Sequence, residues 1–327
     1  MCRDTIKRKI PFCYCLASFI TAIIIVTAFG LSALAQDKEQ QRFKSPEDAF
    51  NTLIEAARNN DTAEMLAIFG PEGKDIVSSG DAVADRRARE HFVKRAADGV
   101  KFSQLDDKTM LPVIGKDQCP FPIPIVKLGQ EWVFSTDEGK QEIINRRIGR
   151  NELNTIQVTL AYVDAQRQYA SKDRNGDGIL QYAQHFMSHK GRKDGLYWEA
   201  APGEEMSPLG PLLARATEEG YSYAERKKGE KPDPYYGYYF KILKGQGSNA
   251  TGGAREYVKD GKMISGFGLI AYPAQYGVSG VITFVVNQFG VVYQRDLGPN
   301  TEDLAKAMTK YDPDKTWIRV EQTSSSR

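Results

Sequence analysis

Oxygen-bearing side chains recur at alternate positions in one short, glycine-rich loop, which is the arrangement that a calcium ion needs. Counting from Asp173, acidic or amide residues take the first, third and fifth positions, and Gly178 takes the sixth, where coordinating loops turn sharply. We expect helices on both sides, one ending near residue 170 and one over 182–189. The candidate ligands, including the main-chain carbonyl at the seventh position, are Asp173, Asn175, Asp177, Ile179, Gln181 and Gln184.

This loop departs from the calcium pattern at its twelfth position. Gln184 stands where the pattern has a bidentate Glu, so only two formal negative charges remain. We therefore expect weak, structural Ca²⁺ binding, with a dissociation constant of about 10⁻⁴ M or higher. The same Asp, Asn and Gly residues also favour a turn without any metal, and the sequence leaves both interpretations open.

A second charged cluster spans residues 146–152 and contains Arg146, Arg147, Arg150 and Glu152. One interpretation is a solvated face whose charges pair with one another. The other is an anion-binding site at a helix start, because guanidinium groups and free N–H groups both suit anions. The acidic and basic block 81–86 is the other dense cluster, and a hydrolase would have to use one of the two blocks.

Histidine and cysteine give weaker signals. His185 and His189 lie one helical turn apart, but no Glu stands between them as in zinc proteases, so solvated histidines are favoured. Cys119 lies among prolines and apolar residues, which favours a buried, inert thiol over a nucleophile. Neither a Gly-x-Ser-x-Gly elbow nor a Walker-type phosphate loop occurs in the sequence.

The first 35 residues have the three parts of a secretory signal peptide. A basic start is followed by an uncharged apolar stretch over 11–34, and Ala33-Leu34-Ala35 provides the small-x-small cleavage pattern. The apolar stretch is also long enough for an uncleaved membrane anchor, which is the alternative. After cleavage we expect no stable membrane anchor, and no cysteine follows at a lipoprotein position.

Removal of that segment changes the charge and the cysteine content. It holds four of the 44 Lys and Arg residues and one of the 42 Asp and Glu residues, so the remaining chain has a net charge of −1. A nearly neutral chain does not attract polyanions, which argues against nucleic acid as a partner. Cys119 is then the only cysteine left, so no internal disulfide is expected and the core must hold the fold.

The elements that must position these groups indicate an α+β protein with a helix-rich N-terminal portion, a small sheet, and a mostly antiparallel C-terminal sheet. Ser45 and Asp61 are placed to cap the first two helices. Residues 78–98 are predicted to form a loop and then a helix that runs to Ala97. Further helices are predicted over 208–219 and 301–308, and over 137–170 as one helix or as two joined at Gly149. Strands are predicted over 111–114, 124–128, 131–135, 235–243, 263–272, 280–286 and 291–295.

Within 137–170, Asn151 is placed to cap a helix, and an apolar stripe runs through Leu153, Ile156, Leu160 and Val163. The glycine-rich stretch 245–253 and the charged stretch 225–233 are predicted to be loops. We expect a signal peptide (1–35), a flexible linker (36–44), a helix-rich α+β domain (45–204) with the calcium-like loop, an antiparallel β-rich domain (205–320), and a disordered tail (321–327).

Several blocks in order resemble the bacterial family called domain of unknown function 2950. The resemblance covers nearly all of the chain after residue 35 and implies an exported envelope protein, but it implies no activity. The blocks that carry it are Phe-Lys-Ser-Pro-Glu-Asp-Ala (43–49), Ser-Ser-Gly-Asp-Ala-Val-Ala-Asp-Arg (78–86), Pro-Phe-Pro-Ile-Pro (120–124), Asn-Arg-Arg-Ile-Gly-Arg-Asn-Glu-Leu (145–153), Ala-Tyr-Val-Asp-Ala-Gln (161–166), Asp-Gly-Leu-Tyr-Trp (194–198), Ser-Pro-Leu-Gly-Pro (207–211) and Tyr-Gly-Val-Ser-Gly-Val (276–281).

Two functions follow as hypotheses. The first is a non-catalytic binding or assembly module, periplasmic or secreted, whose partner is an envelope protein or a cell-wall component. The second is a periplasmic hydrolase that uses the charged residues of the 81–86 or 146–152 block. The sequence identifies no general acid and base for the second.

Overall fold

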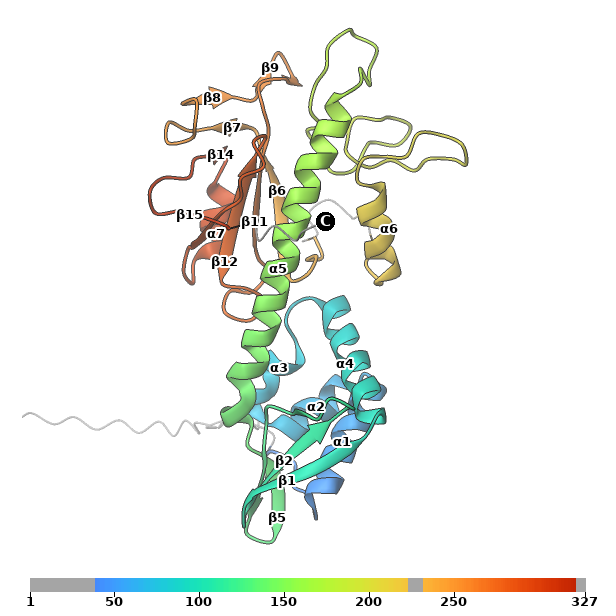
Figure 1. The fold of residues 1–327 in the computed structure, drawn as a ribbon, viewed down its shortest axis with the longest axis vertical. Helices are drawn as coiled ribbons and strands as arrows, with labels where there is room; N and C mark the ends of the chain where they lie inside the picture. The colour runs from blue at the N-terminus through green and yellow to red at the C-terminus, as the bar shows by residue number, and fades with distance from the viewer. Residues whose placement is uncertain (1–38, 223–231, 322–327) are drawn as a thin grey trace, which may run out of the picture. The chain divides into compact units, whose positions relative to one another are not determined.

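A computed structural model describes residues 39–222 and 232–321, all of which belong to one compact unit, Lys38–Arg327. Helices dominate the N-terminal half and antiparallel sheets the C-terminal portion, so the predicted α+β class is confirmed (Figure 1). The signal peptide predicted for 1–35 lies outside the described residues, as does most of the predicted loop 225–233. The division into two domains near residue 205 stays a prediction.

The N-terminal helices begin where local capping predicts. The Ser45 side chain accepts a hydrogen bond from the Asp48 N–H at 3.0 Å, and Asp61 accepts one from the Glu64 N–H at 2.9 Å. Both predicted caps are therefore confirmed. The elements are α1 (Pro46–Arg58), α2 (Thr62–Phe69), the 3₁₀ turn η1 (Pro71–Gly73), α3 (Lys74–Val77) and α4 (Ala82–Ala97).

The first sheet is antiparallel and packs against these helices. Its strands run in the order β1-β2-β4-β5, with β3 paired to β2. Where α1 packs on the sheet, Phe50 of that helix makes edge-on contacts with the rings of Phe92, Phe102 and Phe121. The sequence did not predict β1, which lies at the edge with most residues exposed. The strands are β1 (Val100–Asp106), β2 (Thr109–Ile114), β3 (Cys119–Pro120), β4 (Ile125–Leu128) and β5 (Glu131–Phe134).

A single helix, α5 (Thr136–Ala170), runs from this sheet to the C-terminal sheet (Figure 1). It is continuous through Gly149, so the one-helix alternative is correct. The predicted cap at Asn151 is wrong, because this residue lies inside the helix and its buried side chain donates to the Ser279 carbonyl at 3.0 Å. Leu153 does not belong to the apolar stripe, since its side chain is 67% exposed.

The C-terminal sheet is covered on both faces. Its interior strand β11 (Gly268–Pro273) turns Leu269 and Ala271 into the core that includes α5, and Ile270 and Tyr272 into the core that includes α7. A strand that is buried on both faces has a continuous run of apolar residues, and this run is why the sequence predicts a strand there. The antiparallel order is β15-β13-β12-β11-β6, formed by Ile318–Arg319, Tyr293–Asp296, Ile282–Asn287, Gly268–Pro273 and Tyr238–Leu243.

Smaller elements complete the C-terminal portion, and two predictions fail there. Residues 182–189 form no helix; Tyr182 instead makes an isolated bridge to Met263. The glycine-rich stretch 245–253 contains a short strand. The remaining elements are α6 (Gly210–Glu218), α7 (Thr301–Ala307), a three-stranded sheet of β14 (Lys310–Tyr311), β7 (Gly245–Gln246) and β8 (Arg255–Glu256), and a hairpin of β9 (Val258–Lys259) and β10 (Lys262–Met263).

Candidate functional site

A cavity of about 370 Å³ lies between the N-terminal helices and α5, and we call it the arginine cavity. Its inner wall is apolar, with Leu53 from α1, Phe69 from α2, Phe92 from α4 and Phe121 from the chain after β3. The Phe92 and Phe121 ring centroids are 5.6 Å apart. This wall is continuous with the core around Phe50, so the cavity has a packed floor.

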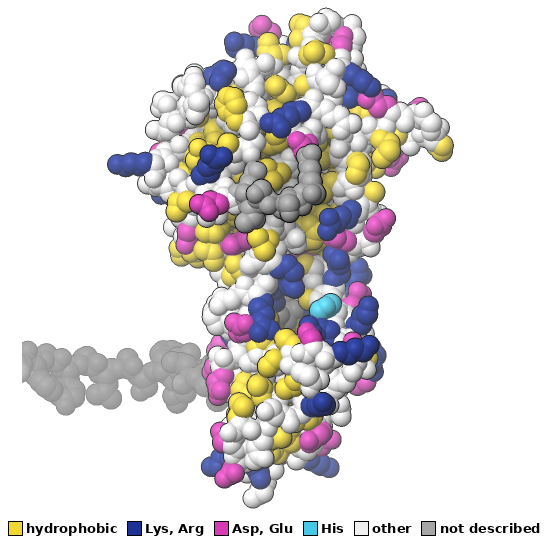
Figure 2. Space-filling view, viewed as in Figure 1, with side chains coloured by type: hydrophobic (Ala, Val, Ile, Leu, Met, Phe, Trp, Pro, Cys, Tyr) yellow, Lys and Arg dark blue, Asp and Glu magenta, His cyan; other side chains and the backbone are white. Residues whose placement is uncertain are grey.

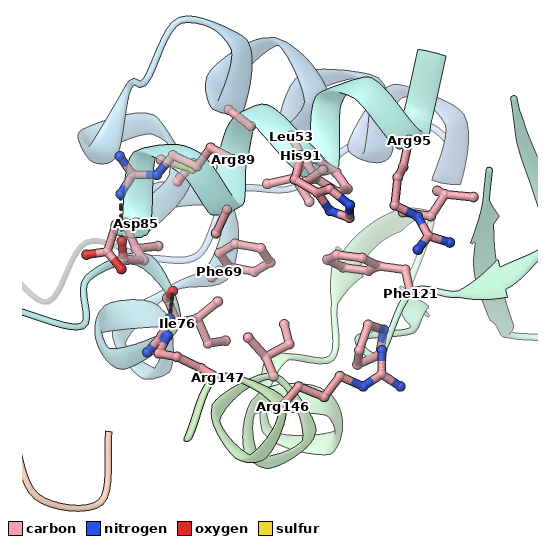
Figure 3. A pocket seen from close by; sticks show the side chains of 18 of the residues that line it. Leu53, Phe69, Ile76, Asp85, Arg89, His91, Arg95, Phe121, Arg146 and Arg147 are labelled. Atoms are coloured by element: carbon pink, nitrogen blue, oxygen red, sulfur yellow. Dashed lines mark hydrogen bonds between the residues drawn. The ribbon is translucent and has the colours of Figure 1, made fainter. Parts of the chain in front are cut away.

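The rim of the arginine cavity is basic. Helix α5 contributes Arg146, Arg147 and Arg150, which share one face because they are three and four residues apart. Helix α4 contributes Arg89 and Arg95. Figure 3 shows the rings of Phe69 and Phe121 facing the centre, with arginines around them, and Figure 2 shows Lys and Arg side chains gathered beside a histidine.

Two of the arginines are held by main-chain carbonyls near the end of α3. Arg147 donates to the carbonyls of Asp75 and Ile76, each at 2.6 Å. Arg89 donates to the Val77 carbonyl at 2.6 Å. Burial lowers the pKa of both guanidinium groups, but an arginine keeps its charge at neutral pH. The α3 segment therefore fixes two positive charges at the cavity.

The guanidinium groups of the other three arginines donate to no main-chain carbonyl that the structure describes. Arg95 and Arg146 pair with carboxylates of Asp117 at 2.5 Å and Glu142 at 2.6 Å. Arg150 makes no hydrogen bond or ion pair with any residue that the structure describes. Burial of its guanidinium, and then repulsion from Arg87, lowers its pKa. Arg150 is thus the rim cation that is ready to receive a ligand.

Among the described residues that line the arginine cavity, Asp85 has the only carboxylate. Asp85 is buried and accepts from the Ser79 N–H at 2.9 Å and from the Ser79 hydroxyl at 2.7 Å. It is nevertheless close enough to raise the pKa of Arg89 and Arg147, against the effect of burial. The carboxylates of Asp85, Asp117 and Glu142 offset three of the five guanidinium charges, so the cavity keeps a net positive charge. Such a site favours an anion whose apolar part can reach the aromatic floor.

Residues 40–320 match the family described as Protein of unknown function (DUF2950). The chain belongs to this family. In the comparisons with curated proteins and with solved structures, no match was found. The predicted resemblance is therefore confirmed.

In this DUF2950 chain the 81–86 block divides between the cavity and a structural junction. Asp81 caps α4 and also accepts from the Tyr221 hydroxyl at 3.0 Å and the Gly237 N–H at 2.9 Å. Burial raises the pKa of Asp81, and these hydrogen bonds oppose the rise. The Asp81 carboxylate is fully engaged by protein donors, so it joins parts of the fold.

The 146–152 block divides in the same way. Its arginines line the cavity, whereas Asn151 and Glu152 contact the C-terminal sheet. One Glu152 carboxylate oxygen accepts from the N–H groups of Val281 and Ile282 at 3.1 and 3.0 Å. The arginines lie well inside α5, so an anion site at a helix start is wrong. The other interpretation, a solvated face with paired charges, is correct for Arg146 alone.

The calcium-like loop is closed on itself by hydrogen bonds. Asp173 accepts from the N–H groups of Asn175, Gly176 and Gly178, which lowers its pKa. An ion pair of 2.7 Å joins Asp177 to Lys262 of β10. In the described part of the chain, no cluster of three or more His, Cys, Asp or Glu residues is arranged to hold a metal ion.

The other predicted ligands divide between the surface and a neighbouring cavity. Ile179 is exposed, and Gln184 donates to the Gly261 carbonyl at 2.6 Å, so it does not close the loop. Asn175, Gln181 and Gln184 line a second cavity beside the loop. The hydrogen bonds within the loop are those of a turn that forms without a metal ion. Calcium binding stays a prediction.

His185 and His189 are both exposed, which agrees with the expectation of solvated histidines, whereas Cys119 is less buried than expected. His189 pairs with Asp194, with 2.9 Å between Nδ1 and the carboxylate. Cys119 is half-buried and lines the arginine cavity together with His91. Over 39–222 and 232–321, no helix is both long and apolar enough to cross a membrane.

Sequence reasoning missed the arginine cavity as a whole. The available signal was the anion interpretation of 146–150, together with the several arginines of the 78–98 segment. What the sequence lacks is any local mark that α4 and α5 face each other across Phe69 and Phe121. That juxtaposition arises from contacts between residues far apart in the chain.

Proposed function

We propose that this chain is an exported, non-catalytic binding module that takes an amphipathic anion into the arginine cavity. The ligand has a carboxylate, phosphate or sulfate headgroup and an aliphatic tail. The observation that carries this proposal is an aromatic floor beneath five arginines with a single carboxylate, Asp85, among them. Envelope lipids and cell-wall components supply molecules of this chemical class.

The headgroup would meet Arg150 first, because Arg150 is the rim arginine without a partner among the described residues. Arg146 is exposed and can exchange Glu142 for a ligand, since an exposed ion pair contributes only about 0.2–1 kcal/mol. Arg89 and Arg147 already donate to main-chain carbonyls, so they act on the headgroup as fixed positive charges near Arg146 and Arg150. The tail would displace water from the wall formed by Phe69 and Phe121, which is favourable.

Binding is favoured over hydrolysis. Cys119 and His91 line the same cavity, but no hydrogen bond joins them; the Cys119 thiol instead lies 3.8 Å from the Pro120 carbonyl. A nucleophile needs a base within hydrogen-bond reach. The hydrolase alternative, which uses the charged residues of the 81–86 or 146–152 block, predicts turnover of acyl or phosphoryl esters that Arg147→Gln reduces. Absence of turnover in the parent chain would remove this alternative.

The test is calorimetric titration of residues 36–327 with three probes below their micelle concentrations. Dodecyl phosphate carries both parts of the ligand, dodecyl maltoside lacks the charge, and inorganic phosphate lacks the tail. We expect dodecyl phosphate to bind at least tenfold more tightly than either of the others. Equal binding of dodecyl phosphate and dodecyl maltoside would show that the arginines play no part.

A matched pair of variants locates the site. Arg150→Gln should weaken dodecyl phosphate about tenfold or more, because a hydrogen bond to a charged group is worth about 1.5–3 kcal/mol. Arg167→Gln removes an exposed arginine from the same helix outside the cavity and should leave binding unchanged. Equal losses in both variants would contradict the assignment to the cavity.

Export and calcium complete the proposal. We propose that residues 1–35 are cleaved and that the chain is released to the periplasm or the medium. A tagged copy that stays at full length in the cytosol would contradict this. We also propose that Asp173 and Asp177 bind a structural Ca²⁺ ion.

A further inference from the structure

A second cavity, of about 650 Å³, lies where the chain leaves α5 at the top of Figure 1, and we call it the polar cavity. It shares no lining residue with the arginine cavity. The calcium-like loop forms one side and residues 191–194 form another. The two glutamines that depart from acidic calcium ligands, Gln181 and Gln184, both line it.

The polar cavity has a rigid back wall. The Tyr169 hydroxyl donates to the Lys193 carbonyl at 2.8 Å, which fixes the far loop to the end of α5. The Arg174 guanidinium lies over the rings of Tyr169 and Trp198, at 5.3 and 5.1 Å from their centroids. Arg174 also pairs with Glu205 at 2.7 Å. A wall held in this way is formed before any ligand arrives.

Several polar side chains of this cavity have no hydrogen-bond partner among the residues that the structure describes. These are the Gln181 amide, the Tyr182 hydroxyl and the His185 imidazole. The His185 imidazole lines the cavity with two ring nitrogens, one of which donates and the other accepts when the ring is neutral. Donors and acceptors thus converge on one space without satisfying one another.

The charges at the opening are mainly positive. Arg192 and Lys193 line it, and Lys244 lies close by. Among the described lining residues the one carboxylate, Asp194, is engaged by the His189 N–H and by the His189 ring, each at 2.9 Å, and lies 4.0 Å from the Arg192 guanidinium. A purely apolar ligand would leave the amide and imidazole groups unsatisfied, which is costly. A ligand rich in hydroxyl groups with one negative charge would satisfy both features.

We propose that the polar cavity binds an acidic saccharide, a sugar ring that carries a carboxylate. Gln181, Tyr182 and His185 exchange hydrogen bonds with the ring hydroxyls, and Arg192 receives the carboxylate. A site built to hydrogen-bond hydroxyl groups discriminates strongly against ligands that lack them.

The test is saturation-transfer NMR titration of residues 36–327 with glucuronate, glucose and acetate. We expect glucuronate to bind at least tenfold more tightly than glucose, which lacks the charge, and than acetate, which lacks the hydroxyls. No glucuronate signal up to its highest usable concentration would overturn the proposal. Acetate binding as tightly as glucuronate would also overturn it, because the site would then be one for simple anions.

Variants separate the contributions. Gln181→Ala should weaken glucuronate and glucose by about the same factor, roughly tenfold, while Arg192→Gln should weaken glucuronate alone. Lys190→Gln removes an exposed cation of the same segment that does not line the cavity, and it should change neither. If Lys190→Gln weakens glucuronate as much as Arg192→Gln, general charge attraction explains the binding and the proposal fails. Arg150→Gln should leave glucuronate binding intact, so failure here and failure of the proposed function are distinguishable.

Discussion

Two aspartates have the same local role and different surroundings. Asp61 and Asp81 each cap a helix by accepting one backbone N–H, at 2.9 Å in both cases. Asp61 is exposed and has only this capping bond, whereas Asp81 is 1% exposed and also accepts from Tyr221 and Gly237. The sequence predicts a cap at Asp61, but the additional role of Asp81 depends on residues more than a hundred positions away.

Replacement of the two caps should therefore have unequal costs. Asp61→Ala should lower the free energy of unfolding by about 1 kcal/mol, the usual cost of losing a cap. Asp81→Ala should lower it by about 2–4 kcal/mol, because it leaves buried donors unpaired. Urea unfolding of both variants measures the difference. Equal costs would mean that the bonds to Tyr221 and Gly237 contribute nothing to stability.

Two carboxyl groups should give pH dependences of opposite sign. Burial raises the pKa of Asp81, so its stabilising contribution is full below pH 3.8 and is lost as the pH rises through its folded pKa. Hydrogen bonds from Lys172 and Arg174 lower the pKa of Glu205 from 4.5 to about 2, so its contribution is full above pH 4.5 and is lost as the pH falls toward about 2.

The measurement is the difference in unfolding free energy between the parent chain and Asp81→Asn or Glu205→Gln, taken from pH 2 upward in steps. The parent's advantage should shrink with rising pH for the first pair and grow for the second. Two curves with the same slope would contradict the opposite effects assigned to burial and to ion pairing.

Lys262 provides the sharpest test of the calcium prediction. Its ammonium pairs with Asp177, so an entering Ca²⁺ has to displace it. We expect calcium to raise the melting temperature of the parent chain, to raise that of Lys262→Met further, and to have no effect on Asp177→Ala. At 100 times the dissociation constant, the stabilisation would be about 2.7 kcal/mol. Identical melting with calcium and with a chelator in all three proteins would remove the calcium site.

At the scale of elements, α5 shows why a glycine does not always end a helix. Gly149 has no atom within 4 Å of the place where a Cβ would stand, so the helix passes it without any packing constraint. Gly139 is different, because a Cβ there would lie 2.3 Å from the Pro122 carbonyl oxygen. The same residue type thus permits close packing at one position and only adds flexibility at the other.

Alanine at these two positions should act in opposite directions. Gly149→Ala should stabilise the chain by about 0.5–1 kcal/mol, because alanine loses less conformational freedom in a helix. Gly139→Ala should destabilise it by about 1–3 kcal/mol through overpacking against Pro122. Both effects are measured as shifts in the midpoint of urea unfolding, provided that the dependence of the unfolding free energy on urea concentration stays the same. A stabilising Gly139→Ala would show that α5 does not pack closely on the 120–124 segment.

At the scale of the whole molecule, polar contacts connect the N-terminal helices and α5 to the C-terminal sheet. Asp81 contacts Gly237, Asn151 contacts Ser279, and Glu152 contacts the start of β12. All three use side chains of the first half and main-chain groups of the second. Because main-chain groups are present at every position, sequence inspection does not reveal such pairs.

Asn151→Ala should therefore reduce stability on both sides of the connection. The loss of one buried hydrogen bond costs about 1–2 kcal/mol, or roughly 2–8 °C in melting temperature. Hydrogen exchange should speed up in α4 and in β12 alike. Asn154→Ala, one turn further along α5, is the control and should change little. Faster exchange confined to β12 would show that the two sides unfold independently.

The sequence by itself determined what depends on neighbours a few residues apart. Helix starts at Ser45 and Asp61, the hairpin between β4 and β5, and the apolar strand β11 follow from capping, turn and burial patterns. These interactions close within three or four residues or along one strand, so they are encoded locally.

Only the tertiary structure decided what each chemical group faces. It turned Leu153 to solvent and buried Asn151, it brought Lys262 to the calcium-like loop, and it set the arginines of α4 and α5 around one aromatic floor. Such pairings depend on the path of the whole backbone, because residues far apart in the chain meet only after every intervening element has packed.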